Sequence, residues 1–156
     1  MPVRANVSNS KIAILAYAAG VIDGEGCISI SADLYRQRTA STTIPYHSLQ
    51  VDVANIDRRL PEFMCRHFGG SIMQGARPNR KPYYRWAIRS KAAEAFLRLV
   101  YPFLAIKKEQ ADIAFRFRKT FGNSGRIITP ERLAERTILR QDLMMLKRSD
   151  CHTSLV

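Results

Sequence analysis

Two acidic residues and three glycines lie within seven positions of this sequence, from Gly20 to Gly26. An apolar, alanine-rich stretch before them predicts a buried helix over residues 11–22. Glycines on both sides of Glu25 allow a tight turn, so its carboxylate is expected at the foot of that helix. A carboxylate placed there could hold a divalent cation, which takes carboxylate and carbonyl oxygens and adds water and phosphate to its shell. Taken alone the pattern is weak evidence, because turns of this composition are common.

The charge balance predicts a polyanionic partner. The 156 residues include 25 Lys and Arg against 13 Asp and Glu, a formal net charge of +12. No fold needs such an excess, which creates self-repulsion, so nucleic acid is the favoured partner and a merely soluble basic protein the plainer alternative. Residues 77–91, "RPNRKPYYRWAIRSK", carry six basic residues, two tyrosines and no acid. A membrane surface is disfavoured, because no helix sets a clustered basic face opposite bulky aromatics.

The remaining composition bounds the compartment and the class of site. Cys27, Cys65 and Cys151 are far apart and form no CxxC, so neither a disulfide framework nor a zinc site is expected. No apolar run reaches the length of a membrane span, and residues 1–11 do not resemble a signal peptide. We therefore expect an intracellular protein that is not secreted, with bacterial or phage cytoplasm and an organelle both left open.

Periodicity predicts one α+β domain over residues 1–156, with a core at about 10–118 and a helical extension at about 129–148. Alternating residues predict two strands over about 28–35 and 48–53, and two more over 71–77 and 82–88. Helices are predicted over residues 11–22, 57–70, 90–104, 107–119 and 129–148. Because strands arrive as hairpins, the sheet is expected to be antiparallel, with one apolar face under the helices and one polar face.

A stripe of small residues on the first helix predicts close helix packing. Ala16, Ala19, Gly20 and Asp23 are spaced i, i+3, i+4 and i+7. These alanines could simply pack on the sheet. A close-packed helix would otherwise come from a second subunit related by a two-fold axis, because the chain has one copy of this helix.

Residues 15–26, "LAYAAGVIDGEG", resemble the signature of the LAGLIDADG homing endonucleases, and "AAGVIDGEG" matches it over nine positions. "VANIDRRLPEFMCRHFGG", "KPYYRWAIRS" and "YPFLAIKKEQAD" resemble further family segments in the same order, so the resemblance covers about residues 12–118. It implies the αββαββα fold, with a curved four-stranded DNA-binding sheet plus C-terminal helices. Ala18 departs from the motif, which has leucine there. One copy of the signature is typical of the homodimeric members.

The resemblance also implies catalytic roles. Glu25 would be the acid ligand of Mg²⁺, with Mn²⁺ or Ca²⁺ able to occupy the same site, and Gly24 would contribute its backbone carbonyl. Lys107 falls at the position of the family's lysine, with Lys108 as the alternative. Asn55 lies near the polar residue that orders the attacking water, and Arg58 or Arg59 could reach the same pocket. Asp23 is expected to pack and cap the paired helices.

Recognition would use the polar face of the sheet, which can lie in the major groove of DNA. The residues expected there by strand alternation are Ser29, Ser31, Asp33 and Tyr35, then Ser48, Gln50 and Asp52, then Met73, Gly75, Arg77, Tyr83 and Arg85. Asn79, Arg80 and Lys81 of the hairpin loop would extend the contact.

The resulting hypothesis is a site-specific homing endonuclease that makes a metal-dependent double-strand break with 3′ overhangs in a long pseudo-palindromic site. The first alternative is a binding protein on the same scaffold, either a maturase for intron RNA or a non-cleaving DNA-binding protein. A generic RNA-binding domain is the second, with Tyr35, Tyr83 and Tyr84 able to stack on bases but no RNP-like run.

Overall fold

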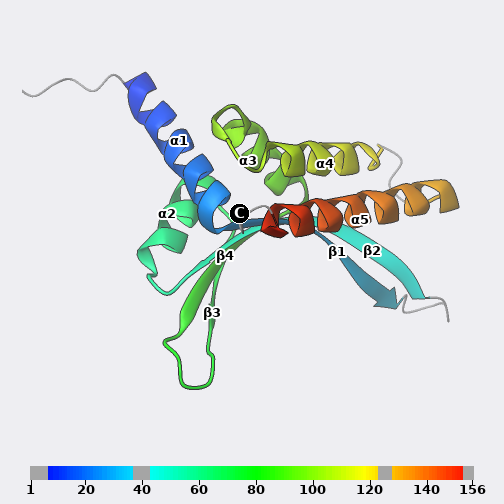
Figure 1. Ribbon diagram of the computed structural model, residues 1–156, viewed down its shortest axis with the longest axis horizontal. Helices are drawn as coiled ribbons and strands as arrows, with labels where there is room; N and C mark the ends of the chain where they lie inside the picture. The colour runs from blue at the N-terminus through cyan, green and yellow to red at the C-terminus, as the bar shows by residue number, and fades with distance from the viewer. Residues whose placement is uncertain (1–6, 37–42, 123–127, 153–156) are drawn as a thin grey trace, which may run out of the picture.

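Helices and strands follow one another in the predicted α-β-β-α-β-β-α-α-α order, which confirms the α+β class. The computed structural model describes residues 7–36, 43–122 and 128–152 (Figure 1). Its elements are α1 (Val7–Glu25), β1 (Gly26–Arg36), β2 (Thr43–Asn55), α2 (Arg59–Phe68), β3 (Ser71–Gly75), β4 (Tyr83–Arg89), α3 (Ser90–Val100), the short 3-10 turn η1 (Tyr101–Phe103), α4 (Lys108–Lys119) and α5 (Pro130–His152).

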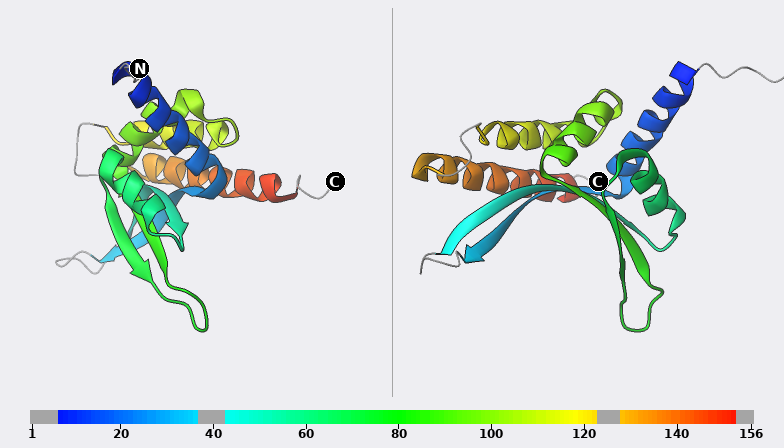
Figure 2. Two further views of the ribbon diagram at one scale, coloured as in Figure 1. Left: turned by 90° about the vertical axis from the view of Figure 1, so that its left-hand side faces the viewer. Right: turned by 180° about the vertical axis from the view of Figure 1, so that it is seen from behind.

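The four strands form one antiparallel sheet in the order β1-β2-β4-β3. Helices α3, α4 and α5 lie along one side of the sheet, and the β1–β2 and β3–β4 hairpins diverge away from them (Figures 1 and 2). The sheet is thereby arched, and the face opposite the helices is concave. The C-terminal end of α1 meets the sheet where the two hairpins diverge.

Strand alternation divides the sheet into the two predicted faces. Ile28, Leu49 and Val51 are fully buried on the helical side, whereas Ser29, Ser48 and Gln50 are only partly covered. Trp86 of β4 packs edge-on against Phe96 of α3, with ring centroids 5.3 Å apart. Burial of each such side chain contributes about 1.5–3 kcal/mol, so this layer holds the helices on the sheet.

The junction between α1 and β1 explains the glycine after Glu25. A Cβ on Gly26 would lie 2.7 Å from the Cα of Ile22 and 2.8 Å from its carbonyl oxygen. Only glycine lets the strand leave so close to the last turn of the helix. Glu25 is the last residue of α1, so its carboxylate lies where helix and sheet meet.

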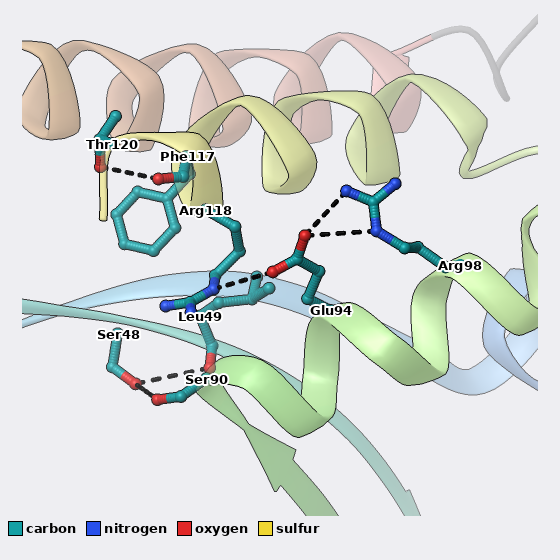
Figure 3. A network of polar contacts seen from close by, with 8 residues as sticks. All are labelled: Ser48, Leu49, Ser90, Glu94, Arg98, Phe117, Arg118 and Thr120. Atoms are coloured by element: carbon teal, nitrogen blue, oxygen red, sulfur yellow. Dashed lines mark hydrogen bonds and ion pairs between the residues drawn. The ribbon is translucent and has the colours of Figure 1, made fainter. Parts of the chain in front are cut away.

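Ion pairs join α3 to α4 above the sheet (Figure 3). Glu94 of α3 accepts from Arg98 Nη2 at 2.8 Å and from Arg118 Nε of α4 at 3.2 Å. Burial on its own would raise the pKa of Glu94, but the hydrogen bonds from the two arginines outweigh it and hold that pKa below its usual value.

Helix α5 packs against β1 and is longer than predicted, since it continues to His152. Its start is capped by Thr129, whose Oγ1 accepts a hydrogen bond from the Arg132 amide at 3.3 Å. Arg140 Nε donates to the Ile30 carbonyl of β1 at 3.1 Å, which ties the helix to the edge strand.

Candidate active site and nucleic-acid interface

Asp23, two residues before Glu25, holds the loop that leads into α4. Its Oδ2 accepts from the Ala105 amide at 2.7 Å, and its Oδ1 accepts from the amides of Ile106 at 3.2 Å and Lys107 at 2.9 Å. One carboxylate therefore satisfies three successive backbone donors ahead of the helix. This contact fixes the backbone of Lys107 against the end of α1.

The Lys107 side chain turns toward the same helix end. Its Nζ donates to the carbonyl of Ile22 at 2.7 Å and to the carbonyl of Gly26 at 2.5 Å. Burial lowers the pKa of Lys107, while the negative charges of Asp23 and Glu25 act in the opposite direction. The predicted catalytic lysine thus lies at the α1 terminus, with its ammonium group bound to backbone carbonyls.

A second lysine near this point was missed by sequence reasoning. Lys147 of α5 places its Nζ 3.2 Å from the Sγ of Cys27, the residue after Gly26. Its positive charge also lowers the pKa of Lys107. Nothing in the local sequence of α5 indicates this, because the contact spans 120 positions along the chain.

Glu25 and Asn55 line one cavity of about 510 Å³. Its other lining residues are Ala54, Ile56, Arg77, Arg80, Lys81 and Tyr83. Lys107 is not among them. Of the three predicted catalytic residues, Glu25 and Asn55 therefore line this cavity together, whereas the Lys107 ammonium group is bound to the carbonyls of Ile22 and Gly26 on either side of the α1–β1 junction.

The two arginines expected near Asn55 are engaged elsewhere. Arg59 pairs with Asp57 through its Nε and Nη2, and this hydrogen bonding lowers the pKa of Asp57 to about 2. Arg58 pairs with Glu62 at 2.7 Å and lies over the Tyr84 ring. Asn55 Oδ1 accepts from the Asp57 amide at 2.8 Å, so this side chain also shapes the turn into α2.

Charged and amide side chains form a linked network on the concave face. Arg89 Nε donates to Gln50 Oε1 at 2.8 Å, and Gln50 Nε2 donates to Asp52 Oδ1 at 3.1 Å. Arg85 Nε lies 3.7 Å from Asp52 Oδ2, an ion pair too long for a hydrogen bond. Arg89 was missed in the predicted DNA-facing set, although strand alternation from Arg85 points to it.

The other predicted DNA-facing residues are distributed over the same face and its hairpins. Ser31 Oγ donates to the Ser48 carbonyl at 3.5 Å, while Asp33 and Met73 are exposed. Tyr35 is opposite Ile44 in the β1–β2 register, and its side chain lies outside the described residues. Gly75 is only partly covered, and the Tyr83 ring occupies the space that a Cβ on Gly75 would take. Asn79, Arg80 and Lys81 are exposed in the loop between β3 and β4.

The predicted small-residue stripe on α1 needs a correction. Ala19 is fully buried in the core of its own chain, and Asp23 is occupied by the loop before α4. Ala16 and Gly20 are exposed. The small residues that α1 leaves open are Ala13, Ala16, Gly20 and Gly24.

Within residues 7–36, 43–122 and 128–152, no three His, Cys, Asp or Glu side chains gather closely enough to hold a metal ion. None of the helices in this part of the chain combines the length and apolarity that a membrane span requires.

Comparison with solved structures identifies the fold. The homing endonuclease I-CvuI, bound to its target in the presence of calcium, matches with a TM-score of 0.70 and 18% identity over 88% of this chain and 83% of that chain. The archaeal intron-encoded homing endonuclease I-Vdi141I, complexed with DNA, matches with a TM-score of 0.68 and 22% identity over 85% of this chain and 82% of that chain.

A longer protein matches over part of its length. The I-SmaMI LAGLIDADG homing endonuclease, bound to cleaved DNA, has a TM-score of 0.58 and 18% identity over 81% of this chain but only 42% of its own. Another structure of I-CvuI was obtained in the presence of magnesium. A scan against protein-family models finds no match. A search of curated proteins finds none either. The arched sheet, the helix order and these structural matches together show that the chain has the fold of the LAGLIDADG homing endonucleases.

Proposed function

We propose that this protein is a site-specific homing endonuclease that cuts both strands of a long, pseudo-palindromic DNA site and leaves 3′ overhangs. The observation that carries the proposal is the cavity in which the exposed Glu25 carboxylate faces Asn55 and basic residues of the β3–β4 loop. A DNA-binding protein gains nothing from a bare carboxylate beside phosphate, because the two repel each other. The carboxylate makes sense when a divalent cation lies between them.

The end of α1 fits a divalent cation. The exposed Glu25 carboxylate and the Gly24 carbonyl are both hard oxygen donors, and the last carbonyls of a helix have no intrahelical partner. One carboxylate is too few for a closed site, so DNA phosphate, water and the matching carboxylate of a second subunit would complete the shell. A cation held there would activate water and neutralise phosphate charge.

The reaction would be phosphodiester hydrolysis. The oxygen of a water forms a bond to phosphorus in line, its proton passes to solvent, and the bond to the leaving oxygen breaks. That oxygen keeps the electron pair and takes a proton from solvent. Asn55 would orient water in the cavity, and Lys107 would hold the α1–β1 junction so that Glu25 keeps its position.

Binding would use the concave face of the sheet. The arch is an antiparallel surface, a kind of element that can enter the major groove, and its side chains include Arg, Gln and Asp, which can read guanine, adenine and cytosine edges. Two copies of the chain related by a two-fold axis would cover a site on the order of two helical turns.

A cleavage selection tests the proposal. The full-length protein is incubated with a library of randomised duplexes and Mg²⁺, and the cut ends are sequenced. Glu25→Gln is run in parallel, with Glu109→Gln as a control that removes an exposed carboxylate from α4. The expected result is a long pseudo-palindromic consensus cut by wild type and by the control, and bound but not cut by Glu25→Gln.

Two outcomes would count against the endonuclease. Enrichment of bound duplexes without cleavage, in either Mg²⁺ or Mn²⁺, would favour the non-cleaving DNA-binding protein. Binding to structured intron RNA in preference to every duplex would favour the maturase.

A further inference from the structure

The loop between β3 and β4 lines the cavity that contains Glu25. Arg77, Arg80 and Lys81 of that loop line the cavity together with Glu25 and Asn55. The basic side chains that line the cavity with Glu25 therefore come from this loop. Lys107, by contrast, has its ammonium group bound to the carbonyls of Ile22 and Gly26.

The local sequence gives this loop a defined shape. The Arg80 amide donates to the Arg77 carbonyl at 3.2 Å, which closes a four-residue turn. Pro78 occupies its second position and Asn79, with φ of 58°, its third, as a turn of this kind prefers. The Cα atoms at the two ends of such a turn lie within about 7 Å, so Arg77 and Arg80 project from neighbouring points.

Tyr83 anchors one end of the turn. Its ring lies across Gly75 of β3, where a Cβ would come within contact distance of the ring atoms and force it away. The Arg77 guanidinium carbon lies 5.0 Å from the centre of that ring, within the range of a cation–π contact. This contact holds the Arg77 side chain against Tyr83 of β4. Because the Arg77 carbonyl accepts from the Arg80 amide, it also helps to position the turn that carries Arg80.

Arg80 differs from the arginines that the family resemblance pointed to. Arg58 is paired with Glu62, and Arg59 with Asp57. The guanidinium group of Arg80 has no hydrogen-bond or ion-pair partner among the described residues, and the side chain is exposed. A guanidinium group is suited to bidentate binding of phosphate oxygens.

We propose that Arg80 is a catalytic residue that binds the scissile phosphate opposite Glu25, and that Arg77, held by Tyr83, is the positioning residue for it. The proposal rests on the proposed endonuclease activity. Arg80 neutralises the charge that develops on the non-bridging phosphoryl oxygens as water attacks. Removal of one such electrostatic contact commonly slows the chemical step by about 10²–10³-fold.

The experiment separates binding from chemistry. The duplex that wild type cuts best is tested with protein in saturating excess, so that the single-turnover rate constant reports the chemical step. The Kd is measured with Ca²⁺ in place of Mg²⁺. Arg80→Ala is compared with Arg80→Lys and with Arg116→Ala, which removes the same charge from the exposed face of α4. Circular dichroism and thermal unfolding establish that each variant is folded.

For Arg80→Ala we expect the saturated rate constant to fall by about 10²–10³-fold, with a Kd change below about tenfold. Arg80→Lys should recover part of the rate, and Arg116→Ala should match wild type. Tyr83→Ala should lower the saturated rate constant. Tyr83→Phe keeps the ring that contacts Arg77, so its rate constant should stay close to that of wild type.

Three outcomes would overturn the assignment. A weakened Kd with an unchanged saturated rate would make Arg80 a DNA contact without a catalytic role. An unchanged Kd together with an unchanged saturated rate would show that Arg80 does not contact the DNA. If wild type cuts no duplex at all, the endonuclease proposal fails together with this one, whereas the first two outcomes leave it standing.

Discussion

Asp23 and Glu25 lie two residues apart at the end of α1, yet their surroundings give them different roles. Asp23 accepts three backbone hydrogen bonds within its own chain, whereas Glu25 is exposed in the basic cavity. Sequence reasoning separated them only through the family resemblance, since both are acids beside glycine. The structure gives the physical reason, which is that one carboxylate is already saturated with donors and the other is open.

Asp23→Asn should destabilise the protein. The amide nitrogen that replaces Oδ2 would face the Ala105 amide, so a donor meets a donor and one backbone hydrogen bond is lost. The expected cost is about 1–3 kcal/mol in the free energy of unfolding, measured by urea denaturation. Asp33→Asn, which changes an exposed carboxylate on β1, is the control and should stay within about 0.5 kcal/mol of wild type. Equal stabilities for the two variants would show that the Asp23 contacts contribute little.

Gln50 links two charged residues on the concave face, and its removal should relax DNA specificity. It accepts from Arg89 and donates to Asp52, so it holds both side chains in fixed positions. Gln50→Ala should reduce discrimination at one or two base pairs of each half-site by about 1–3 kcal/mol, the value of one good bidentate contact. Competitive binding of single-base variants of the selected duplex measures this. An unchanged preference at every position would exclude Gln50 from base readout.

At the scale of elements, periodicity predicted the strands and their faces well and the helix faces less well. The core side of β1 and β2 alternates with the polar side as expected, because a strand has only two faces. In α1 almost every residue is apolar or small, so several faces of the helix could equally well pack against another element. The sequence therefore gave no means to choose between Ala19, which is buried, and Ala13, which is exposed.

Some placements depend on the sheet as a whole. The Pro and Asn of the β3–β4 loop predict a tight turn, but only the curvature of the sheet decides that this turn borders the Glu25 cavity. The ion pair between Arg59 and Asp57 is local, and their spacing of two residues could have predicted it. The contact of Lys147 with Cys27 could not, because it joins distant parts of the chain.

The link between α3 and α4 should make stability depend on pH. Because the pKa of Glu94 is lowered in the folded state, its ionised form stabilises the fold above the unfolded-state pKa. That contribution is lost as the pH falls through the folded-state pKa. Glu94→Gln should therefore be less stable than wild type by about 1–3 kcal/mol at pH 7.

The gap between Glu94→Gln and wild type should close as the pH falls below the ordinary glutamate value. Urea denaturation at a series of pH values between about 7 and 3 measures this closure. Asp33→Asn should show no comparable change. A gap that stays constant at every pH would assign the effect to packing, with no contribution from the charge of Glu94.

At the scale of the whole molecule, no element within residues 7–36, 43–122 and 128–152 covers one face of α1. The exposed small residues of α1 run beside the end that carries Glu25, and Ile12 and Tyr17 on the same helix are also about half exposed. A second copy packed on this face would bring two Glu25 carboxylates together. Under the proposed function each chain would supply the carboxylate for one cut, so cleavage of both strands would require a dimer.

Gly20→Leu should test this dependence without harming the chain itself. A Cβ at Gly20 meets no atom within 4 Å, so the monomer has room for a larger side chain, whereas a helix packed against it would not. Overpacking of this kind costs about 1–3 kcal/mol for each subunit, so dimer dissociation should become at least about tenfold easier. Analytical ultracentrifugation across a concentration series measures the dissociation constant.

The matched control is Ala95→Leu, which creates the same side chain at an exposed site on α3 and adds one carbon atom fewer. It should dimerise and cut both strands as wild type does. Gly20→Leu should instead lose double-strand cleavage in step with dimerisation, and recover it at high protein concentration. A Gly20→Leu protein that remains dimeric and fully active would place the subunit interface on another face of the molecule. A wild-type protein that cuts both strands as a monomer would show that the second carboxylate is not required.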